Sequence, residues 1–486
     1  MKTRFIYNDT CQVPHSVVNI IGSSSFGNVI YNKKTLCERA MSAARNAGIT
    51  DCICIDNFDQ LEALQLEIHL DSESTVYINM LSSAVATDED AFVLALRKLS
   101  MAKTTCALTH NSPQLICCNS PAVFKLYLEQ LKRKKEILVE EIFENIVLIG
   151  PTDFIMDIST IDTFLKFFSG SFSVRHFNHI SGNTNEIHKE SIDKIKIKNE
   201  HDFYYLLPHQ MQTWFVQPYG YREDKEKASY TMERLQIPDA SLLWIHQAFD
   251  KKQLRTFLNK IMCFISARPQ RTCSVERSQN TTQSLFMAKI TSRFEQLKKK
   301  DGFSQIDALI SIGTHFSGLS AVIDRYQRLF NANTAALSVR QEVIGHGDLC
   351  FSNMLYDKDM GLLKLIDPKG SQTQGDLWTH PYYDIAKVSH SVLGLYDYIN
   401  HGLFEIVVDE QNMLQIEFIS PEMGWQRDMF LELLQERHYD PFLCRLCEAS
   451  LFLSMLPLHM DYPRKVLGFI LIAIHILEEL EKHAKI

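Results

Sequence analysis

One stretch near residue 350 constrains the fold of this chain more than any other. Residues 343–370 read VIGHGDLCFSNMLYDKDMGLLKLIDPKG, in which two short apolar segments are separated by the turn-forming KDMG. Short apolar runs bounded by Gly, Asp and Asn are typical of strands joined by a tight turn. We therefore predict a loop, a β-hairpin and a second loop that begins at Asp367. Both loops would emerge at the same end of a small sheet, where Asp348, Asn353 and Asp367 converge.

Two carboxylates and a carboxamide at one place suit phosphoryl transfer. Magnesium takes oxygen ligands such as those of Asp and Asn, and a further carboxylate can accept the proton of an attacking hydroxyl. Kinases carry an H-x-D-x-x-x-x-N loop followed, after the next hairpin, by a metal-binding Asp. Here His346, Asp348, Asn353 and Asp367 occur in that order and spacing. The alternative, that Asn353 and Asp367 only cap turns, would require several residue types to agree by coincidence.

This stretch resembles the aminoglycoside phosphotransferase and choline kinase superfamily, the small-molecule branch of the protein-kinase fold. HGDL, the following Asn and IDPKG are particularly similar to its sugar- and fructosamine-kinase-type members. The resemblance covers residues 170–486 and implies an α+β bilobal domain with a mostly helical C-lobe. It also implies Asp348 as catalytic base, Asn353 and Asp367 as magnesium ligands, His346 as an anchor of the catalytic loop, and ATP and Mg²⁺ as cofactors.

The upstream half of a kinase requires a strand lysine for the phosphates and a helix glutamate that holds this lysine. Lys189 lies in EIHKESID, the second arm of a predicted β-hairpin, and Glu200 begins the next predicted helix. We predict this pair, although Lys194, Lys196 and Lys198 compete for the role of the lysine.

Two further segments bear on nucleotide binding. ASYTMERL, residues 228–235, resembles the hinge between kinase lobes, where backbone groups of Met232, Glu233 and Arg234 would pair with adenine. An ordinary edge strand is an equally good interpretation. The stretch FFSGSFSVRH contains Gly170 alone where protein kinases carry G-x-G-x-x-G, so the assignment of a phosphate loop is weak.

A helix in the C-terminal half carries one more acidic candidate. Asp384, in YYDIAKVSHS, matches a helix-borne Asp of the superfamily that would brace the catalytic loop. An acidic residue near a helix N-terminus is an equally good interpretation, because it would favour the helix dipole.

The first 150 residues alternate between strand-like and helix-like segments. Strands are predicted at residues 17–22, 51–56 and 75–81, and helices at 35–49 and 88–100. Such alternation favours a parallel sheet covered on both faces, an α/β domain of Rossmann-like type.

This N-terminal region resembles the start of a sugar nucleotidyltransferase. Such enzymes begin with a strand, a glycine-rich loop that bears an arginine, and then a lysine before a helix. Gly22, Gly27 and Lys34 preserve part of this pattern, but the arginine of the loop is missing. Ser82 and Ser83 stand where the resemblance implies a metal-binding Asp, so nucleotidyl transfer should be poor. We therefore interpret the domain as degenerate and favour a non-catalytic role, such as binding a nucleotide or sugar phosphate or bracing the kinase.

Composition limits the remaining classes. The 486 residues predict three parts: a nucleotidyltransferase-like domain at 1–150, a kinase-like N-lobe at 151–240 and a helical C-lobe at 241–486. A net charge of −8 and a pI near 6.1 argue against a nucleic-acid-binding surface. The longest apolar run, residues 466–477, is too short to span a membrane, and the twelve cysteines lie mainly in apolar segments typical of buried thiols. We expect a cytoplasmic protein without membrane insertion.

These observations predict an ATP-dependent phosphotransferase that acts on a hydroxyl of a small molecule. The fusion to a nucleotidyltransferase-like domain suggests a sugar, polyol or related metabolite, for example in capsule or surface-polysaccharide synthesis. The alternative is a binding or scaffold protein built from a pseudokinase and a pseudo-nucleotidyltransferase. A bifunctional enzyme with a live nucleotidyltransferase is a third option that we do not favour.

Overall fold

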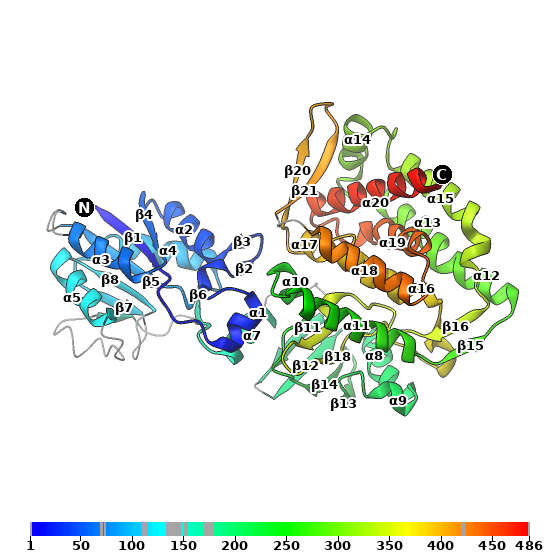
Figure 1. Cartoon of the computed structure of the whole chain (residues 1–486). Helices are drawn as coiled ribbons and strands as arrows, with labels where there is room; N and C mark the ends of the chain where they lie inside the picture. The colour runs from blue at the N-terminus through cyan, green and yellow to red at the C-terminus, as the bar shows by residue number, and fades with distance from the viewer. Residues whose placement is uncertain are drawn as a thin grey trace. The chain divides into compact units, whose positions relative to one another are not determined.

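The computed structural model describes most of the chain and divides it into two compact units. The described residues are 2–68, 71, 74–108, 114–132, 147–149, 154–169, 178–183, 185–419 and 423–484. Unit 1 comprises Met1–Ser173 with His246–Ala248, and unit 2 comprises Val174–Ile245 with Phe249–Ile486. Figure 1 shows the elements of both units.

Unit 1 is built on a six-stranded sheet with the order β4-β1-β5-β8-β7-β9. The strands of this sheet are β1 (Thr3–Asn8), β4 (Asp51–Ile55), β5 (Val76–Leu81), β7 (Cys106–Leu108), β8 (Leu115–Cys118) and β9 (Val147–Ile149). The smaller strands are β2 (Ile30–Tyr31), β3 (Lys34–Thr35), β6 (Ala84–Ala86) and β10 (Ile155–Asp157). The helices are α1 (His15–Ile21), η1 (Phe26–Asn28), α2 (Leu36–Asn46), α3 (Phe58–Glu67), α4 (Glu89–Leu99), α5 (Pro121–Lys132) and α7 (Ile161–Ser169).

Helices cover both faces of this sheet, as predicted. Because side chains alternate along a strand, Phe5 and Tyr7 of β1 pack with α2 and α4, whereas Ile6 packs with α3 and α5 on the other face. The sheet is mixed and not wholly parallel: β1 runs parallel to β4 and β5, but β8 runs antiparallel to both β5 and β7. The prediction of a parallel sheet is thus correct for β1, β4 and β5 and wrong at β8.

The predicted strand at residues 17–22 is a helix. Residues His15–Ile21 form α1, and Val17, Ile20 and Ile21 are buried. Their spacing of three and four residues suits one side of a helix, which the continuous apolar run VVNII concealed. The first strand is instead β1, so the glycine-rich segment follows a helix and does not directly follow a strand.

Unit 1 extends beyond the predicted boundary at residue 150. Ile155–Asp157 form β10, which pairs antiparallel with β6 of the same unit. Residues 154–169 therefore belong to unit 1 and not to the predicted kinase-like N-lobe.

Unit 2 begins with a four-stranded antiparallel sheet and one helix. The sheet has the order β11-β12-β14-β13, formed by β11 (Asn178–Gly182), β12 (Glu186–Ser191), β13 (Pro218–Glu223) and β14 (Ala228–Glu233). Helix α8 (Lys194–Leu206) follows β12 and packs on the sheet, where Ile197 meets Tyr230 and Met232. The predicted hairpin is the pair β11 and β12.

The remainder of unit 2 is mostly helical, which agrees with the expected α+β domain and its helical second lobe. Its helices are α9 (His209–Gln212), α10 (Ala240–Ile245), α11 (Lys251–Ala267), α12 (Val275–Gln283), η3 (Ser284–Ala288), α13 (Lys289–Leu297), α14 (Phe303–Gly313), α15 (Leu319–Leu337), α16 (Pro381–Val392), α17 (Tyr396–Asn400), α18 (Gly424–Glu436), α19 (Pro441–Met455) and α20 (Pro463–Ala484). Short strands lie among them: β15 (Gln270–Thr272), β16 (Gln341–Ile344), β17 (Met354–Asp357), β18 (Leu362–Leu365), β19 (Trp378–Thr379), β20 (Phe404–Val408) and β21 (Leu414–Phe418).

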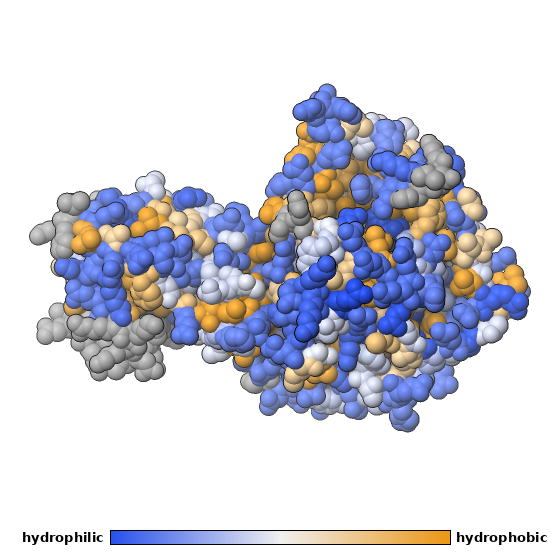
Figure 2. All heavy atoms as spheres, viewed as in Figure 1, coloured by the Kyte–Doolittle hydropathy of each residue, from blue (hydrophilic) through white to orange (hydrophobic). Residues whose placement is uncertain are grey.

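Apolar side chains of the helical part are largely internal. The stretch Pro441–Leu458 is long and apolar enough to cross a membrane, yet 78% of it is buried inside the structure. Helices α16, α19 and α20 pack on one another and form this core. Hydrophilic side chains predominate on the face shown in Figure 2, and apolar ones form small groups.

One buried acid in unit 2 makes stability sensitive to pH. Asp397, at the start of α17, is 1% exposed. Burial raises the pKa of Asp397 to about 7, and nearby Asp239 adds a like charge that acts in the same direction. The folded protein therefore holds a proton that the unfolded chain releases near pH 4.

We expect Asp397→Asn to stabilise the protein more at pH 8 than at pH 5. The penalty for the buried acid grows as pH rises through the range between the unfolded and folded pKa values, and it amounts to a few kcal/mol at most. Thermal unfolding of the variant and the wild type at both pH values measures this difference. Asp324→Asn, at an exposed position of α15, is the control. An equal effect of Asp397→Asn at both pH values would contradict the prediction.

Candidate active site

Two loops of unit 2 meet at the predicted site. Strand β16 leads into Gly345–Asp348, and the hairpin of β17 and β18 leads into the loop that begins at Ile366. Hydrogen bonds join the two loops: Lys369 N donates to the His346 carbonyl at 3.0 Å, and Ile366 N donates to the Asn353 carbonyl at 3.1 Å. The sequence prediction of loop, hairpin and second loop is confirmed.

Asp384 braces the first of these loops. Its buried carboxylate accepts hydrogen bonds from the backbone N–H groups of His346 and Gly347, each at 2.9 Å. Arg268 Nη1 donates to the same carboxylate at 3.0 Å. Of the two interpretations of Asp384, the structure therefore supports the brace, because a simple helix-terminal acid would not bind the loop.

His346 is an anchor of the loop and not a group available for proton transfer. Its Nε2 bonds to the carbonyl of Ile366 at 2.9 Å, and its Nδ1 accepts from the N–H of Asp348 at 3.2 Å. Both contacts require the neutral ring with its proton on Nε2. Burial lowers the pKa of His346, which favours the same neutral form. The ring also stacks on Phe215.

Asp348 lies open to solvent and is held by two neighbours. Its side chain is 45% exposed, and Lys387 Nζ forms an ion pair with its Oδ1 at 2.8 Å. Asn353 Nδ2 donates to the Asp348 carbonyl at 2.9 Å and to Oδ2 at 3.3 Å. The carboxylate is thus fixed in direction while remaining accessible to an acceptor hydroxyl.

The sequence analysis did not predict a role for Lys387. It lies three residues after Asp384 on α16, so both side chains project from the same face of one helix toward the loop. Burial alone would lower the pKa of Lys387, but Asp348 raises it above the ordinary value, so the ammonium stays charged. The i, i+3 spacing from Asp384 was the signal that could have revealed it.

Asp367 faces the same region from the second loop. Its side chain is 35% exposed and accepts a hydrogen bond from Lys189 Nζ at 2.9 Å. Its φ of 53° lies in the left-handed region, an uncommon and costly conformation for a residue other than glycine. Residues in such conformations cluster at functional sites, where surrounding contacts hold them.

The residues present fit a magnesium ion carried by a nucleotide. No cluster of three or more His, Cys, Asp or Glu suited to a metal occurs in the part of the chain that the structure describes. Magnesium, however, commonly binds through one or two carboxylates together with substrate phosphates and water. Asp367 supplies a carboxylate, and Asn353 keeps its Oδ1 as a further oxygen donor because Nδ2 is bonded to Asp348.

Lys189 and Glu200 lie together, as the sequence analysis placed them. Lys189 on β12 forms an ion pair with Glu200 on α8 at 2.7 Å, and both side chains are almost fully buried. The competing lysines at 194, 196 and 198 lie on α8 and not on a strand. Burial alone would lower the pKa of Lys189, but Asp367, Tyr230 and Glu200 raise it well above the ordinary value.

A glycine that the sequence analysis did not single out lets the second loop touch α8. At Gly370 a Cβ atom would lie 2.8 Å from the backbone carbon of Asn199 and 2.9 Å from the nitrogen of Glu200, and its φ is +85°. The N–H of Ser371 donates to the Asn199 carbonyl at 3.1 Å. Only glycine permits this approach, which couples the Asp367 loop to the helix that carries Glu200.

The predicted hinge lies at the end of β14. Met232 is buried on the sheet, and Glu233 ends the strand. The N–H of Arg234 donates to the carbonyl of Asn185 at 2.8 Å. Because this N–H is already bonded within the protein, the prediction that Arg234 pairs with adenine through it is wrong. Gly170, the candidate for the phosphate loop, lies outside the described residues.

In unit 1 the predicted glycine-rich loop binds the side chain of Asp9. Gly27 N donates to the Asp9 carboxylate at 3.1 Å, and a Cβ at Gly27 would lie 2.5 Å from the same oxygen. Ser82 and Ser83, at the position of the implied metal acid, are both buried after β5. The amide of Gly27 is thus occupied by a carboxylate where a phosphate-binding loop would leave it free.

Comparisons with known proteins show low similarity. No protein-family model and no curated protein matches the chain. A thermostable mutant of aminoglycoside phosphotransferase APH(4)-Ia in its apo form is 11% identical, with a TM-score of 0.37, and covers 65% of this chain and 98% of its own. Aminoglycoside-3'-phosphotransferase of type VIII is 13% identical, with a TM-score of 0.28 over 65% of this chain and 98% of its own. Choline kinase from Cryptosporidium parvum Iowa II is 12% identical, with a TM-score of 0.27 over 64% of this chain and 90% of its own.

Overlap at this level does not bear on chemistry, which depends on the geometry given above. The roles of Lys189, Glu200, Asp348, Asn353 and Asp367 in catalysis and binding stay predictions that follow from their positions.

We expect Lys189→Met to lower the free energy of unfolding by about 3–5 kcal/mol, because it removes the buried cation of Glu200 and leaves only the more distant and exposed Lys196, at 3.7 Å. The double variant Lys189→Met/Glu200→Gln should recover most of this loss, since neither charge remains. Thermal or denaturant unfolding measures both. The matched control is Lys198→Met, whose partner Asp202 lies on the same helix in an exposed pair and whose loss should cost less than about 1 kcal/mol. A double variant as unstable as the single one would contradict the expectation.

Proposed function

We propose that unit 2 transfers the terminal phosphoryl group of ATP to a hydroxyl of a small molecule. The observation that carries this proposal is that the loops bearing Asp348 and Asp367 lie together beside Lys189 of β12 and Glu200 of α8. Asn353 binds Asp348 on one loop, and the N–H of Ile366, next to Asp367, donates to the Asn353 carbonyl. Asp367 itself contacts Lys189, which forms the buried ion pair with Glu200. Kinases assign these residue types to the proton, the metal and the phosphates.

Each residue would have a distinct task in the transfer. Lys189, held by Glu200, would contact phosphate oxygens of ATP from β12. Asp348 would accept the proton of the acceptor hydroxyl as its oxygen bonds to the γ-phosphorus and the bond to the β-phosphate oxygen breaks, which releases ADP. Lys387 and Asn353 would keep the Asp348 carboxylate aimed at that hydroxyl.

Magnesium would be held by Asp367 and Asn353 and would supply neutralisation of the triphosphate charge. The acceptor belongs to the class of sugars, polyols and related metabolites, and a role in the synthesis of capsule or surface polysaccharide is part of the proposal. The fusion with an α/β unit supports that role by association.

We expect Asp348→Asn to lower kcat by about two to four orders of magnitude, the usual contribution of a positioned base. Asp367→Asn should also lower kcat strongly, because it removes a ligand of the magnesium that neutralises the triphosphate. Neither variant should unfold the protein. An ATP-consumption assay over sugars, polyols, amino alcohols and glycated amines identifies the acceptor and measures the loss. Asp324→Asn on α15 is the matched control. Full turnover in either site variant would refute the assignment.

Binding of ATP distinguishes the role of Asp348 as base from that of Asp367 as magnesium ligand, and it tests the scaffold alternative. A ligand of the native state raises the unfolding midpoint, so wild type and Asp348→Asn should both shift with ATP plus Mg²⁺. Asp367→Asn should lose the magnesium-dependent part of that shift. A wild-type protein that shows neither a magnesium-dependent shift nor turnover would favour the pseudokinase scaffold.

We expect Lys387→Met to lower kcat and to move the acid limb of the kcat/KM profile to higher pH. A nearby cation favours the ionised form of a carboxylate, so its removal leaves Asp348 protonated over a wider range. Lys387→Arg should restore the limb because it retains the charge. A profile that keeps its shape in Lys387→Met would show that the lysine has a purely structural role.

A further inference from the structure

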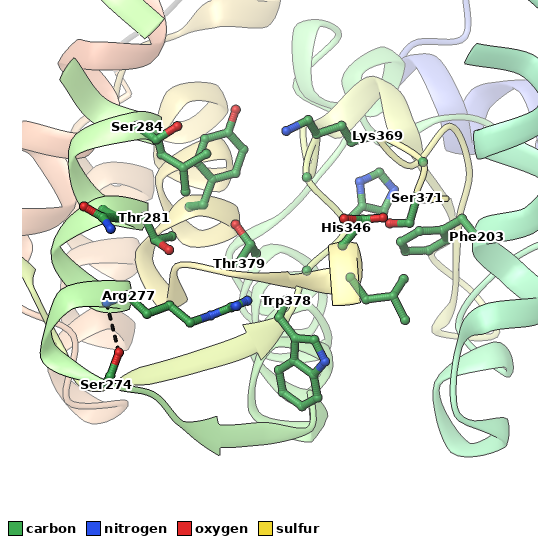
Figure 3. A pocket seen from close by; sticks show the side chains of 18 of the residues that line it. Phe203, Ser274, Arg277, Thr281, Ser284, His346, Lys369, Ser371, Trp378 and Thr379 are labelled. Carbon is green, nitrogen blue, oxygen red and sulfur yellow. Dashed lines mark hydrogen bonds between the residues drawn. The ribbon is translucent and has the colours of Figure 1, made fainter. Parts of the chain in front are cut away.

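A cavity of about 550 Å³ opens beside the catalytic loop. Its volume falls within the range of small-molecule sites. One wall is α12 with the start of η3, and the opposite wall is the segment Lys369–Ser371 with Phe203 of α8. The floor comprises Gly345–Gly347, Leu377–Thr379 and Tyr383. Figure 3 shows Thr281 and Ser284 on the helical wall and Ser371 and Phe203 across from them.

The α12 wall presents a row of polar side chains to this cavity. Arg277, Asn280, Thr281 and Ser284 line it at a spacing of three, four and seven residues, which places them on one helix face. In the described part of the chain, the side chains of Asn280, Thr281 and Ser284 make no hydrogen bond that holds the helix. Their neighbours do hold it: Ser278 Oγ donates to the Val339 carbonyl at 2.7 Å. The row is therefore free to bind hydroxyl groups of a ligand.

The backbone changes form along this wall. Ser284–Ala288 form a π-helical turn between α12 and α13, and Ser284 and Leu285 of this turn line the cavity. Single π turns inside helices occur frequently at functional sites, where they re-aim side chains.

Two cations reach the cavity from different walls (Figure 3). Arg277 uses its Nε for Glu342, at 2.6 Å, while Arg271 donates two further bonds to the same carboxylate. One buried carboxylate thus faces two guanidinium groups, and the terminal nitrogens of Arg277, whose side chain is 50% exposed, make no bond among the described residues. The ammonium of Lys369 likewise has no ion pair within the described chain.

The lining also contains two acidic residues, Asp376 and Glu276. Asp376 accepts hydrogen bonds from the N–H and Oγ1 of Thr373 and thereby closes a turn of its own loop. Glu276 is an exposed residue in the first turn of α12, where the helix dipole favours an acid.

Two lysines outside the lining act on Tyr383 at the end of the cavity near the loop. Tyr383 lines this end and accepts a hydrogen bond from Lys289 Nζ at 3.0 Å. Burial alone would raise the pKa of Tyr383, but Lys387 and Lys289 lower it below the ordinary value. Lys387 in turn binds Asp348, so the proposed base lies close to Tyr383 of the lining.

We propose that this cavity is the acceptor site and that the acceptor is a polyhydroxylated anion, a sugar phosphate or a sugar acid. The Arg277 fork and the Lys369 ammonium would bind its phosphate or carboxylate, because a guanidinium matches both geometries. The polar row of α12 would bind its hydroxyls, and a free hydroxyl would lie toward Gly347 and Asp348. This assignment of substrate class depends on the phosphotransferase function proposed above.

Binding to the full chain tests the class of ligand directly. The unfolding midpoint is measured with glucose 6-phosphate, gluconate, glucose, glucosamine and inorganic phosphate at matched ionic strength. We expect shifts with glucose 6-phosphate, gluconate or both, and these two arms separate a phosphate from a carboxylate. Equal shifts with glucose or glucosamine, or with inorganic phosphate alone, would overturn the proposal, as would no shift with either sugar anion.

Variants localise the binding. Arg277→Gln and Lys369→Gln should each weaken the apparent affinity for the responding sugar anion about 10- to 100-fold, the usual loss for a charge-assisted hydrogen bond. Arg328→Gln and Lys252→Gln, at exposed positions on α15 and α11, are the matched controls and should bind as the wild type does. Unchanged affinity in Arg277→Gln would place the anion elsewhere.

The same variants keep this inference separate from the proposed function. The magnesium-dependent shift with ATP should be unchanged in Arg277→Gln, because the guanidinium is not part of the nucleotide site. A sugar-anion shift that requires Arg277 in a protein without ATP binding would leave the cavity assigned and the kinase function refuted. ATP binding without any sugar-anion shift would do the reverse.

Discussion

The carboxylate of Asp384 is the constraint on which the site depends. It is fully buried and accepts from two consecutive backbone N–H groups of the catalytic loop and from Arg268. Gly347, one of the two residues bound by this carboxylate, has a φ of +81°, a conformation that favours glycine. A buried carboxylate is tolerated only when its oxygens are satisfied in this manner. The loop backbone and the acid therefore stabilise each other, and neither would hold its position alone.

From this anchor the geometry extends step by step to the phosphate-binding side. His346, fixed by the grip of Asp384, binds the Ile366 carbonyl and thereby positions the residue before Asp367. Gly370 then brings the same loop onto the backbone of α8, next to Glu200. Lys189 then forms ion pairs with both Glu200 and Asp367. A displacement at any of these contacts would reach the others through short and buried bonds.

The parts of the site that the sequence could predict are those encoded by spacing along one segment. His346 to Asn353 share a single loop, and Asp367 follows a hairpin whose turn is visible in KDMG, so their convergence followed from local geometry. Lys189 and Glu200 were also placed correctly, because a strand residue and the next helix are close in sequence.

What the sequence analysis missed depends on contacts between distant segments. Lys387 reaches Asp348 only because Asp384 docks α16 on the loop, and the cavity beside it forms only when α12 faces residues 369–371. In unit 1 the apolar run VVNII fitted a strand or a helix equally well by composition, and burial against the folded unit decided for α1. Likewise, the four residues of β8 do not indicate that this strand runs antiparallel to β5.

The distribution of charge gives the site a consistent physical logic. Each proposed functional carboxylate has a lysine from a different element: Asp367 has Lys189 of β12, and Asp348 has Lys387 of α16. Two acids brought close together would otherwise repel and favour a shared proton. Here each carboxylate has a counter-ion of its own. The two ammonium groups thus lie on different sides of the loop, Lys189 on β12 and Lys387 on α16. An arrangement of this kind is organised for negative charge before any ligand arrives, which is the condition under which fixed dipoles and charges contribute most to phosphoryl transfer.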